Sequence, residues 1–253
     1  MNETGGIYGQ FYAELNASWA IAKKDIAIYY LKPNIIVSGA LFPLFMFLAF
    51  AVGKPASPSV MIPGLIAITI LFSASSIEPV SIPIERRMKT FDRLISAPVS
   101  LHAVVLGESL SGFLYSIGIA FVPLVAGLLM FGTPVQDFLS LFCGIILTAF
   151  CFATMGTLFA AYPTESPGDI MSMLNLVRLP LIFISGVFIP LEAIPSAGQV
   201  LIYASPLTYG HDLIQGAYQG STHFSPLVDI AMLFIFILVF QIIANHLYKK
   251  FNE

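Results

Sequence analysis

The residues best suited to polar chemistry in this sequence lie in one short segment, Glu85–Leu94, which reads ERRMKTFDRL. Six of its ten residues are charged, whereas the 253-residue chain has only 11 Lys or Arg and 14 Asp or Glu in total. Acidic and basic side chains in such a mixture form ion pairs, but the segment lacks the paired nucleophile and base that covalent catalysis needs. It therefore predicts a contact surface.

No other set of residues predicts catalysis or metal binding. The histidines are scattered without the close spacing of metal ligands, at positions His102, His211, His223 and His246. The only Gly-Lys pair, Gly53-Lys54, is followed by proline, so the phosphate-binding pattern G-x-x-x-x-G-K-[ST] is absent. We therefore expect no catalytic residues, no metal and no bound cofactor, and any energy from ATP must come from another polypeptide.

The composition predicts a membrane protein. Hydrophobic residues make up 57% of the chain and charged residues 10%, against about 25% charged residues in ordinary soluble domains. The formal net charge of -3 gives no field that would attract a nucleic acid. The fold class expected is an all-α, polytopic membrane protein.

Six stretches are long and apolar enough to cross a bilayer as helices, which takes about 20 residues each. They are residues 34–53, 61–78, 103–131, 138–161, 173–191 and 227–248. If the N-terminus is cytoplasmic, ten of the 11 basic residues lie inside and only Lys54 outside, with Arg178 counted near the inner start of the fifth span. We expect a plasma-membrane protein with both termini in the cytoplasm.

Two segments outside the spans are also expected to be helical. Residues 1–33 mix aromatic, apolar and lysine side chains, which predicts an amphipathic helix lying in the membrane interface. The alternative is a loosely ordered tail. Residues 192–226 predict short helices, broken at Pro195 and Pro206, that lie on or dip into the outer leaflet.

The charged segment fits one short cytoplasmic helix over residues 84–96. Ile84, Met88, Phe91 and Ile95 would share an apolar face, and the charged residues would face the cytoplasm. This helix is interpreted as a docking surface for a cytosolic partner. A solvated loop, whose basic residues fix the topology and touch anionic lipids, is equally compatible with the sequence.

Polar residues within the predicted spans are candidates for a transport pathway, although serines also serve to pack helices together. The central layer of the predicted spans has no acidic residue, which disfavours ion-coupled transport. The candidate pathway residues are Ser73, Ser76, Asn175, Arg178 and Phe183.

Three motifs, in their order and topology, resemble those of type-2 ABC exporter permeases, which include antibiotic-resistance and polysaccharide-export permeases. They are ERRMKTFDRLISAPVS from Glu85, FISGVFIPLEAIP from Phe183 and SPLTYGHDLIQG from Ser205. The resemblance covers about residues 15–250. This sequence departs from it at Gln215, where many members carry Arg, and in the basic loop, where only Thr90 of a frequent Gly-Thr pair is kept.

The resemblance implies two membrane subunits, a second copy of this chain or a related permease, working with two ABC ATP-binding subunits that hold ATP and Mg. It assigns ATPase docking to Glu85, Arg86, Arg87, Met88, Lys89, Phe91, Asp92 and Arg93. It places an outer gate at Phe188, Pro190, Glu192, Pro206 and Tyr209. The expected substrate is a drug, a lipid or a lipid-linked glycan, and the alternative is a stand-alone secondary transporter or channel.

Overall fold

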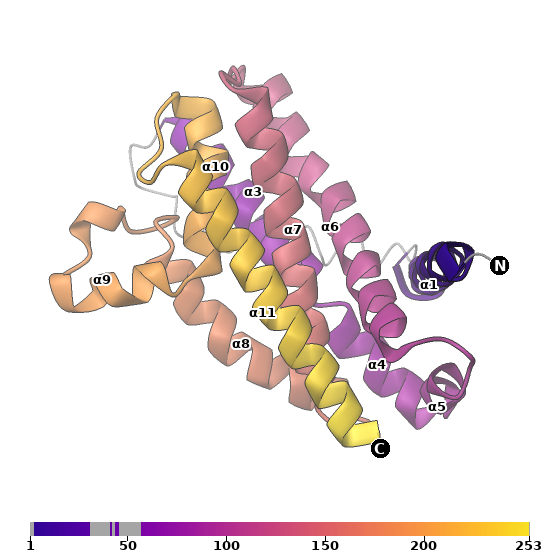
Figure 1. Cartoon of the computed structure of the whole chain (residues 1–253). Helices are drawn as coiled ribbons and strands as arrows, with labels where there is room; N and C mark the ends of the chain where they lie inside the picture. Colours follow the sequence, from indigo (N-terminus) through magenta and orange to yellow (C-terminus); the bar gives the residue numbers. More distant parts are fainter. Residues whose placement is uncertain (1–2, 31–40, 42–43, 46–56, 253) are drawn as a thin grey trace.

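The computed structural model describes residues 3–30, 41, 44–45 and 57–252, and every regular element within them is helical (Figure 1). Helix α1 (Glu3–Asp25) continues into the π-helical turn η1 (Ile26–Tyr30). The helices of the bundle are α3 (Pro58–Ala74), α4 (Glu78–Arg87), α5 (Thr90–Ile95), α6 (Leu101–Phe131), α7 (Phe138–Ala160), α8 (Pro167–Ile184) and α11 (Pro226–Asn252). Between α8 and α11 lie η2 (Leu191–Ala193), α9 (Ser196–Tyr203) and α10 (Pro206–Gln219).

Five helices among the described residues are long and apolar enough to span a membrane, and each overlaps one of the predicted spans. They are Pro58–Arg87, Leu101–Phe131, Phe138–Ala160, Pro167–Ile184 and Pro226–Phe251. The predicted first span, residues 34–53, lies outside the described residues except at positions 41, 44 and 45.

The predicted fifth span, residues 173–191, is wrong at both ends. Helix α8 begins at Pro167 and ends at Ile184, because Gly186 takes a left-handed φ of 85°, a conformation that ends a helix. Arg178 is thus the twelfth residue of α8, about 16 Å along it. It lies well inside the span instead of at the cytoplasmic start, where the topology prediction counted it.

Helix α3 forms the centre of the bundle. It packs against α6, α7 and α10, and from Ile62 to Ala74 every residue is buried. A helix that is apolar on all sides is stable only away from water, and for α3 the surrounding helices provide that environment. Helix α10, within the predicted outer segment 192–226, also packs into the bundle against α3, α7 and α11, and the predicted breaks at Pro195 and Pro206 are confirmed.

Helix α1 lies at a steep angle to the bundle. Figure 1 shows it nearly end-on beside the half of α6 nearest α4, while α6, α7 and α11 run across the view. Gly107 of α6 makes this contact possible, since a Cβ there would lie 2.8 Å from the Ser18 carbonyl oxygen. Ser18 in turn donates a hydrogen bond to the Ala103 carbonyl oxygen at 2.8 Å. The helix itself is confirmed, whereas its position in the membrane interface stays a prediction.

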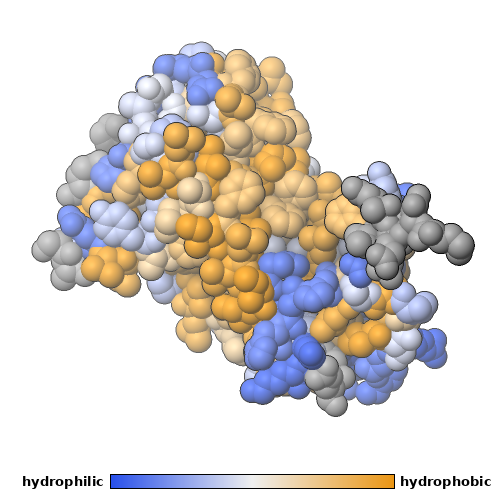
Figure 2. Space-filling view, viewed as in Figure 1, coloured by the Kyte–Doolittle hydropathy of each residue, from blue (hydrophilic) through white to orange (hydrophobic). Residues whose placement is uncertain are grey.

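The surface divides into an apolar belt and polar ends. Figure 2 shows apolar residues over the middle of the bundle and hydrophilic residues at the end where Figure 1 places α5 and the C-terminus. The connection between α6 and α7 lies at the opposite end (Figure 1). This distribution is that of a protein whose middle faces hydrocarbon.

Candidate functional site

The charged segment forms two helices instead of the single helix predicted over 84–96. Helix α4 ends at Arg87, and Lys89 takes a left-handed conformation with φ 58° before α5 begins. The turn is held by the Lys89 N–H, which donates to the Arg86 carbonyl at 3.0 Å, and by the Thr90 hydroxyl, which donates to the Glu85 carbonyl at 3.2 Å. We call residues 84–96 the coupling segment below, after the docking role predicted for them from the sequence.

The break splits the predicted apolar face. Phe91 is fully buried beside Tyr248 of α11, with ring centroids 6.0 Å apart, while Met88 is 58% exposed. Arg86 lies over the Phe91 ring and donates to the carbonyl oxygens of Tyr162 and Ala161 beyond α7. Two of the eight predicted docking residues, Arg86 and Phe91, therefore hold the segment against the bundle.

Glu85, a third predicted docking residue, is buried and ties the segment to α1. Its Oε1 atom accepts a hydrogen bond from Lys24 Nζ at 2.7 Å and one from the Tyr29 hydroxyl at 3.4 Å. Lys24 Nζ also lies 3.0 Å from Asp25 Oδ1, and the buried carboxylate of Glu108 in α6 adds to the negative potential around it.

This buried cluster shifts the pKa values of the α1 residues. Burial, the largest effect, raises the pKa of Asp25 to about 6, although the Lys24 ammonium acts in the opposite direction. For Lys24, burial lowers the pKa, but the charges of Glu108, Asp25 and Glu85 outweigh it and raise the pKa above its ordinary value. Sequence reasoning treated Lys24 only as a topology signal, and nothing in the local pattern links it to Glu85, 61 residues away.

The remaining predicted docking residues form an exposed surface on the coupling segment. They are Arg87, Met88, Lys89, Asp92 and Arg93. Lys89 Nζ lies 3.8 Å from Glu165 Oε1, but both side chains are largely exposed, and such pairs contribute little to stability. Three cations and one carboxylate are thus presented at the polar end of the molecule.

The predicted pathway residues do not form one lining. Arg178 is fully buried and donates to the Ser76 hydroxyl at 3.0 Å and to Ser75, which was not among the candidates. Ser73 is buried and donates to the Thr69 carbonyl of its own helix at 2.6 Å. Asn175 is half-buried, and Phe183 is 39% exposed with its ring centroid 6.0 Å from that of Phe188.

The predicted gate residues divide between a surface turn and the bundle interior. Phe188 is half-buried, Pro190 is exposed, and Glu192 belongs to η2. Pro206 and Tyr209 are buried in α10, where the Tyr209 hydroxyl donates to the Tyr203 carbonyl at 2.9 Å.

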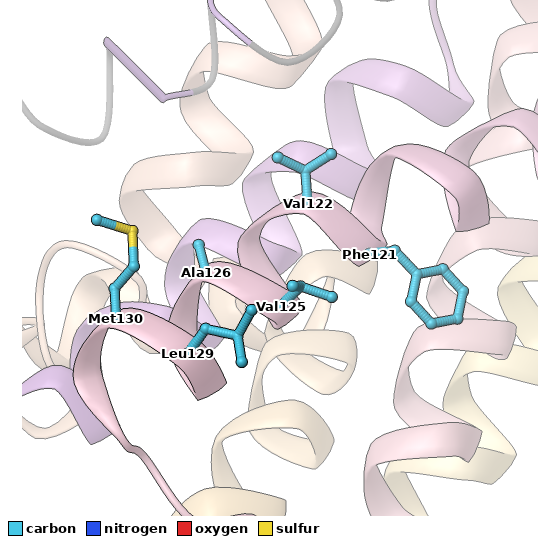
Figure 3. A pocket seen from close by; sticks show the side chains of 6 residues that line it. All are labelled: Phe121, Val122, Val125, Ala126, Leu129 and Met130. Carbon is cyan, nitrogen blue, oxygen red and sulfur yellow. The ribbon is translucent and has the colours of Figure 1, made fainter.

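A hollow of about 530 Å³ lies along the half of α6 farthest from the coupling segment (Figure 3). Its lining is entirely apolar: Phe121, Val122, Val125, Ala126, Leu129 and Met130. It contains none of the predicted pathway or gate residues, and its chemistry suits hydrocarbon such as lipid acyl chains.

Comparison with known proteins gives a consistent result. A family model described as ABC-2 type transporter matches residues 16–218. The inner membrane transport permease YadH of Escherichia coli K12 is 24% identical over 192 residues, covering 75% of this chain and 74% of that protein. The putative transport permease ycf38 of Cyanophora paradoxa is 24% identical over 249 residues, covering 87% of this chain and 83% of that protein.

Proposed function

The chain belongs to the ABC-2 type transporter family, as a transport permease subunit, and from this premise we propose that the coupling segment is where a separate ABC ATPase docks. The observation that carries this proposal is the division of the segment into two sides. Glu85 fixes it to α1, Arg86 and Phe91 fix it to the bundle, and the exposed side chains on the other side are free to contact a partner. A stiff, anchored contact is what a soluble motor needs in order to move a membrane domain.

We further propose that the transporter exports a hydrophobic or amphipathic substrate, such as a drug, a lipid or a lipid-linked glycan. It would act as a pair of permease subunits with two ATPases that bind ATP and Mg. The apolar belt and the polar, basic coupling end support a multi-pass plasma-membrane protein with both termini cytoplasmic. The name of the bacterial relative, an inner membrane transport permease, points to the same location.

The pathway and gate assignments remain proposals of different weight. Ser76 and Arg178 meet one another inside the bundle, whereas Phe183 and Phe188 meet at the end of α8. The α8 end and the turn that follows it are therefore the better candidates for a surface that contacts substrate, and Arg178 is reached only if the bundle opens.

A charge exchange on the exposed side tests the docking proposal. The variant Arg87→Glu with Asp92→Arg keeps the buried anchors and reverses two exposed charges, so we expect loss of co-purification with the ATPase and unchanged membrane insertion. Lys250→Glu is the matched control, because it reverses an exposed charge at the same polar end outside the segment. ATPase binding by the double variant at the wild-type level would contradict the proposal.

A further inference from the structure

Span two is interrupted at residues 75–77, where α3 gives way to α4. Pro79 lies in the first turn of α4 and has no N–H to donate to the Ser75 carbonyl four residues earlier, which favours an interruption here. The α4 side continues to Arg87 and the coupling segment, and the α3 side forms the centre of the bundle. We call residues 74–78 the joint.

Three helices converge on this joint at very short range. A Cβ at Gly112 of α6 would lie 2.7 Å from the Ala74 carbonyl oxygen, and one at Gly156 of α7 would lie 2.9 Å from Ser75 Cα. The Glu78 carboxylate fills the remaining space and accepts a hydrogen bond from the Gly112 N–H at 3.1 Å. Helices α6 and α7 thus enclose the joint closely without side chains of their own.

The third helix, α8, reaches the joint through a single charged side chain. Arg178 donates to the Ser75 hydroxyl from Nε at 3.0 Å and from Nη2 at 2.7 Å, and to the Ser76 hydroxyl at 3.0 Å. Its guanidinium lies over the Phe72 ring, 5.3 Å from the centroid. No ion pair between Arg178 and a carboxylate occurs among the described residues, so the hydrogen bonds of this buried cation go to the joint.

We propose that Arg178 is a positioning residue that pins the joint of span two to α8, so that movement of the coupling segment is passed to the outer end of α8. The inference rests on the proposed function, since it assumes that an ATPase moves the coupling segment. Six residues beyond Arg178, α8 ends before the turn at Gly186, where an added Cβ would lie 3.1 Å from Leu191 Cγ and 3.5 Å from His211 Nδ1. The contact of Arg178 with Ser75 and Ser76 therefore connects the inner end of the molecule, through α8, with η2 and α10.

The chemistry of the contact allows the pin to be removed without unfolding the bundle. Both serine hydroxyls also donate to carbonyl oxygens of α3, so they keep a partner when Arg178 is lost. Loss of one partner of a buried contact is costly mainly when the other is left unsatisfied, and here both hydroxyls keep a carbonyl acceptor. The Arg178→Met variant should therefore form a normal complex that fails only to pass movement of the coupling segment to the outer end of α8. The double variant Ser75→Ala with Ser76→Ala removes the acceptors of the same contact and should have the same effect.

Hydrogen exchange in the purified complex with its ATPase tests this, measured with and without ADP and vanadate. In the wild type we expect changes both in residues 84–97 and in residues 185–195. In Arg178→Met and in the double serine variant, we expect the first change to persist and the second to be lost. Arg178→Lys should restore part of the second, because an ammonium reaches one hydroxyl but lacks the guanidinium fork.

Ser116→Ala is the matched control, since this buried serine donates only to the Phe113 carbonyl of its own helix α6 and should leave both responses intact. A response at residues 185–195 that survives Arg178→Met would overturn the pin. The proposal would also be overturned if neither Arg178→Met nor the double serine variant gave a folded complex, because the contact would then be purely structural. No response at residues 84–97 in the wild type would refute the docking proposal, and this inference with it.

Discussion

The docking of α1 on α6 is expected to weaken as pH rises, because of Asp25. This side chain is fully buried, and burial raises its pKa from the ordinary 3.8 to about 6. Between these two pH values the docked helix holds a proton that the undocked helix has released. The contribution to docking is therefore complete below about pH 4 and is lost as pH rises through about 6.

The magnitude follows from the same two pKa values. Their separation of about 2 pH units corresponds to about 3 kcal/mol over the full range, at about 1.4 kcal/mol per unit. Between about pH 5 and pH 7.5, the equilibrium constant for undocking should rise roughly tenfold. Asp25→Asn removes the titrating group and should flatten this dependence, and Glu14→Gln, an exposed carboxylate on the same helix, should leave it intact.

Thiol labelling measures this equilibrium directly. Ala22 is fully buried against the bundle and Ala20 is exposed on the same helix, so the ratio of labelling rates of Ala22→Cys and Ala20→Cys cancels the pH dependence of the thiol itself. Native Cys143 and Cys151 are first replaced by alanine. A ratio that falls with pH, or one that rises equally in the Asp25→Asn background, would refute the assignment to Asp25.

Two stability predictions concern packing. Phe91→Ala should destabilise the protein by about 3 kcal/mol, because it empties a fully buried site against Tyr248, whereas Met88→Ala on the exposed side should cost less than about 0.5 kcal/mol in the same thermal unfolding assay. Gly210→Ala should cost about 1–3 kcal/mol, since its Cβ would lie 2.2 Å from Thr148 Oγ1 and 3.0 Å from Thr148 Cβ; an unchanged melting temperature would mean that α10 is not held in the bundle.

The spans could be predicted because hydrocarbon imposes a length and a composition on any helix that crosses it. The breaks at Pro195 and Pro206 could be predicted because proline lacks the N–H of a helical hydrogen bond and is favoured at the start of a helix, where both of these residues lie. The turn at Lys89 could not be predicted in this way. The apolar spacing from Ile84 to Ile95 fits a continuous helix, and the turn at the left-handed lysine is stabilised by the hydrogen bond that the Thr90 hydroxyl donates to the Glu85 carbonyl.

The charged residues of this chain could be counted from the sequence, but how deeply each side chain is buried could not be predicted. The topology rule treats Lys24, Lys89 and Arg178 as equivalent markers of the inside. In the structure, Lys89 is exposed, Lys24 is partly buried among carboxylates, and Arg178 is fully buried within a span. The three side chains differ in depth because their interaction partners differ. For Arg178, the partner Ser75 lies 103 residues earlier in the chain.

A signal for that partner was nevertheless present in the second span. Pro79 follows the run SASS, so the sequence places a helix interruption beside hydroxyl groups in an otherwise apolar stretch. Polar groups at such an interruption have no water to bind inside a bilayer, so their partners must come from the same helix or from another one. An arginine within an apolar span has only hydrogen-bond donors, and hydrocarbon provides no acceptors for them. Each feature alone predicts only an unsatisfied group; together they predict a contact between span two and span five, which is where Arg178 meets Ser75 and Ser76.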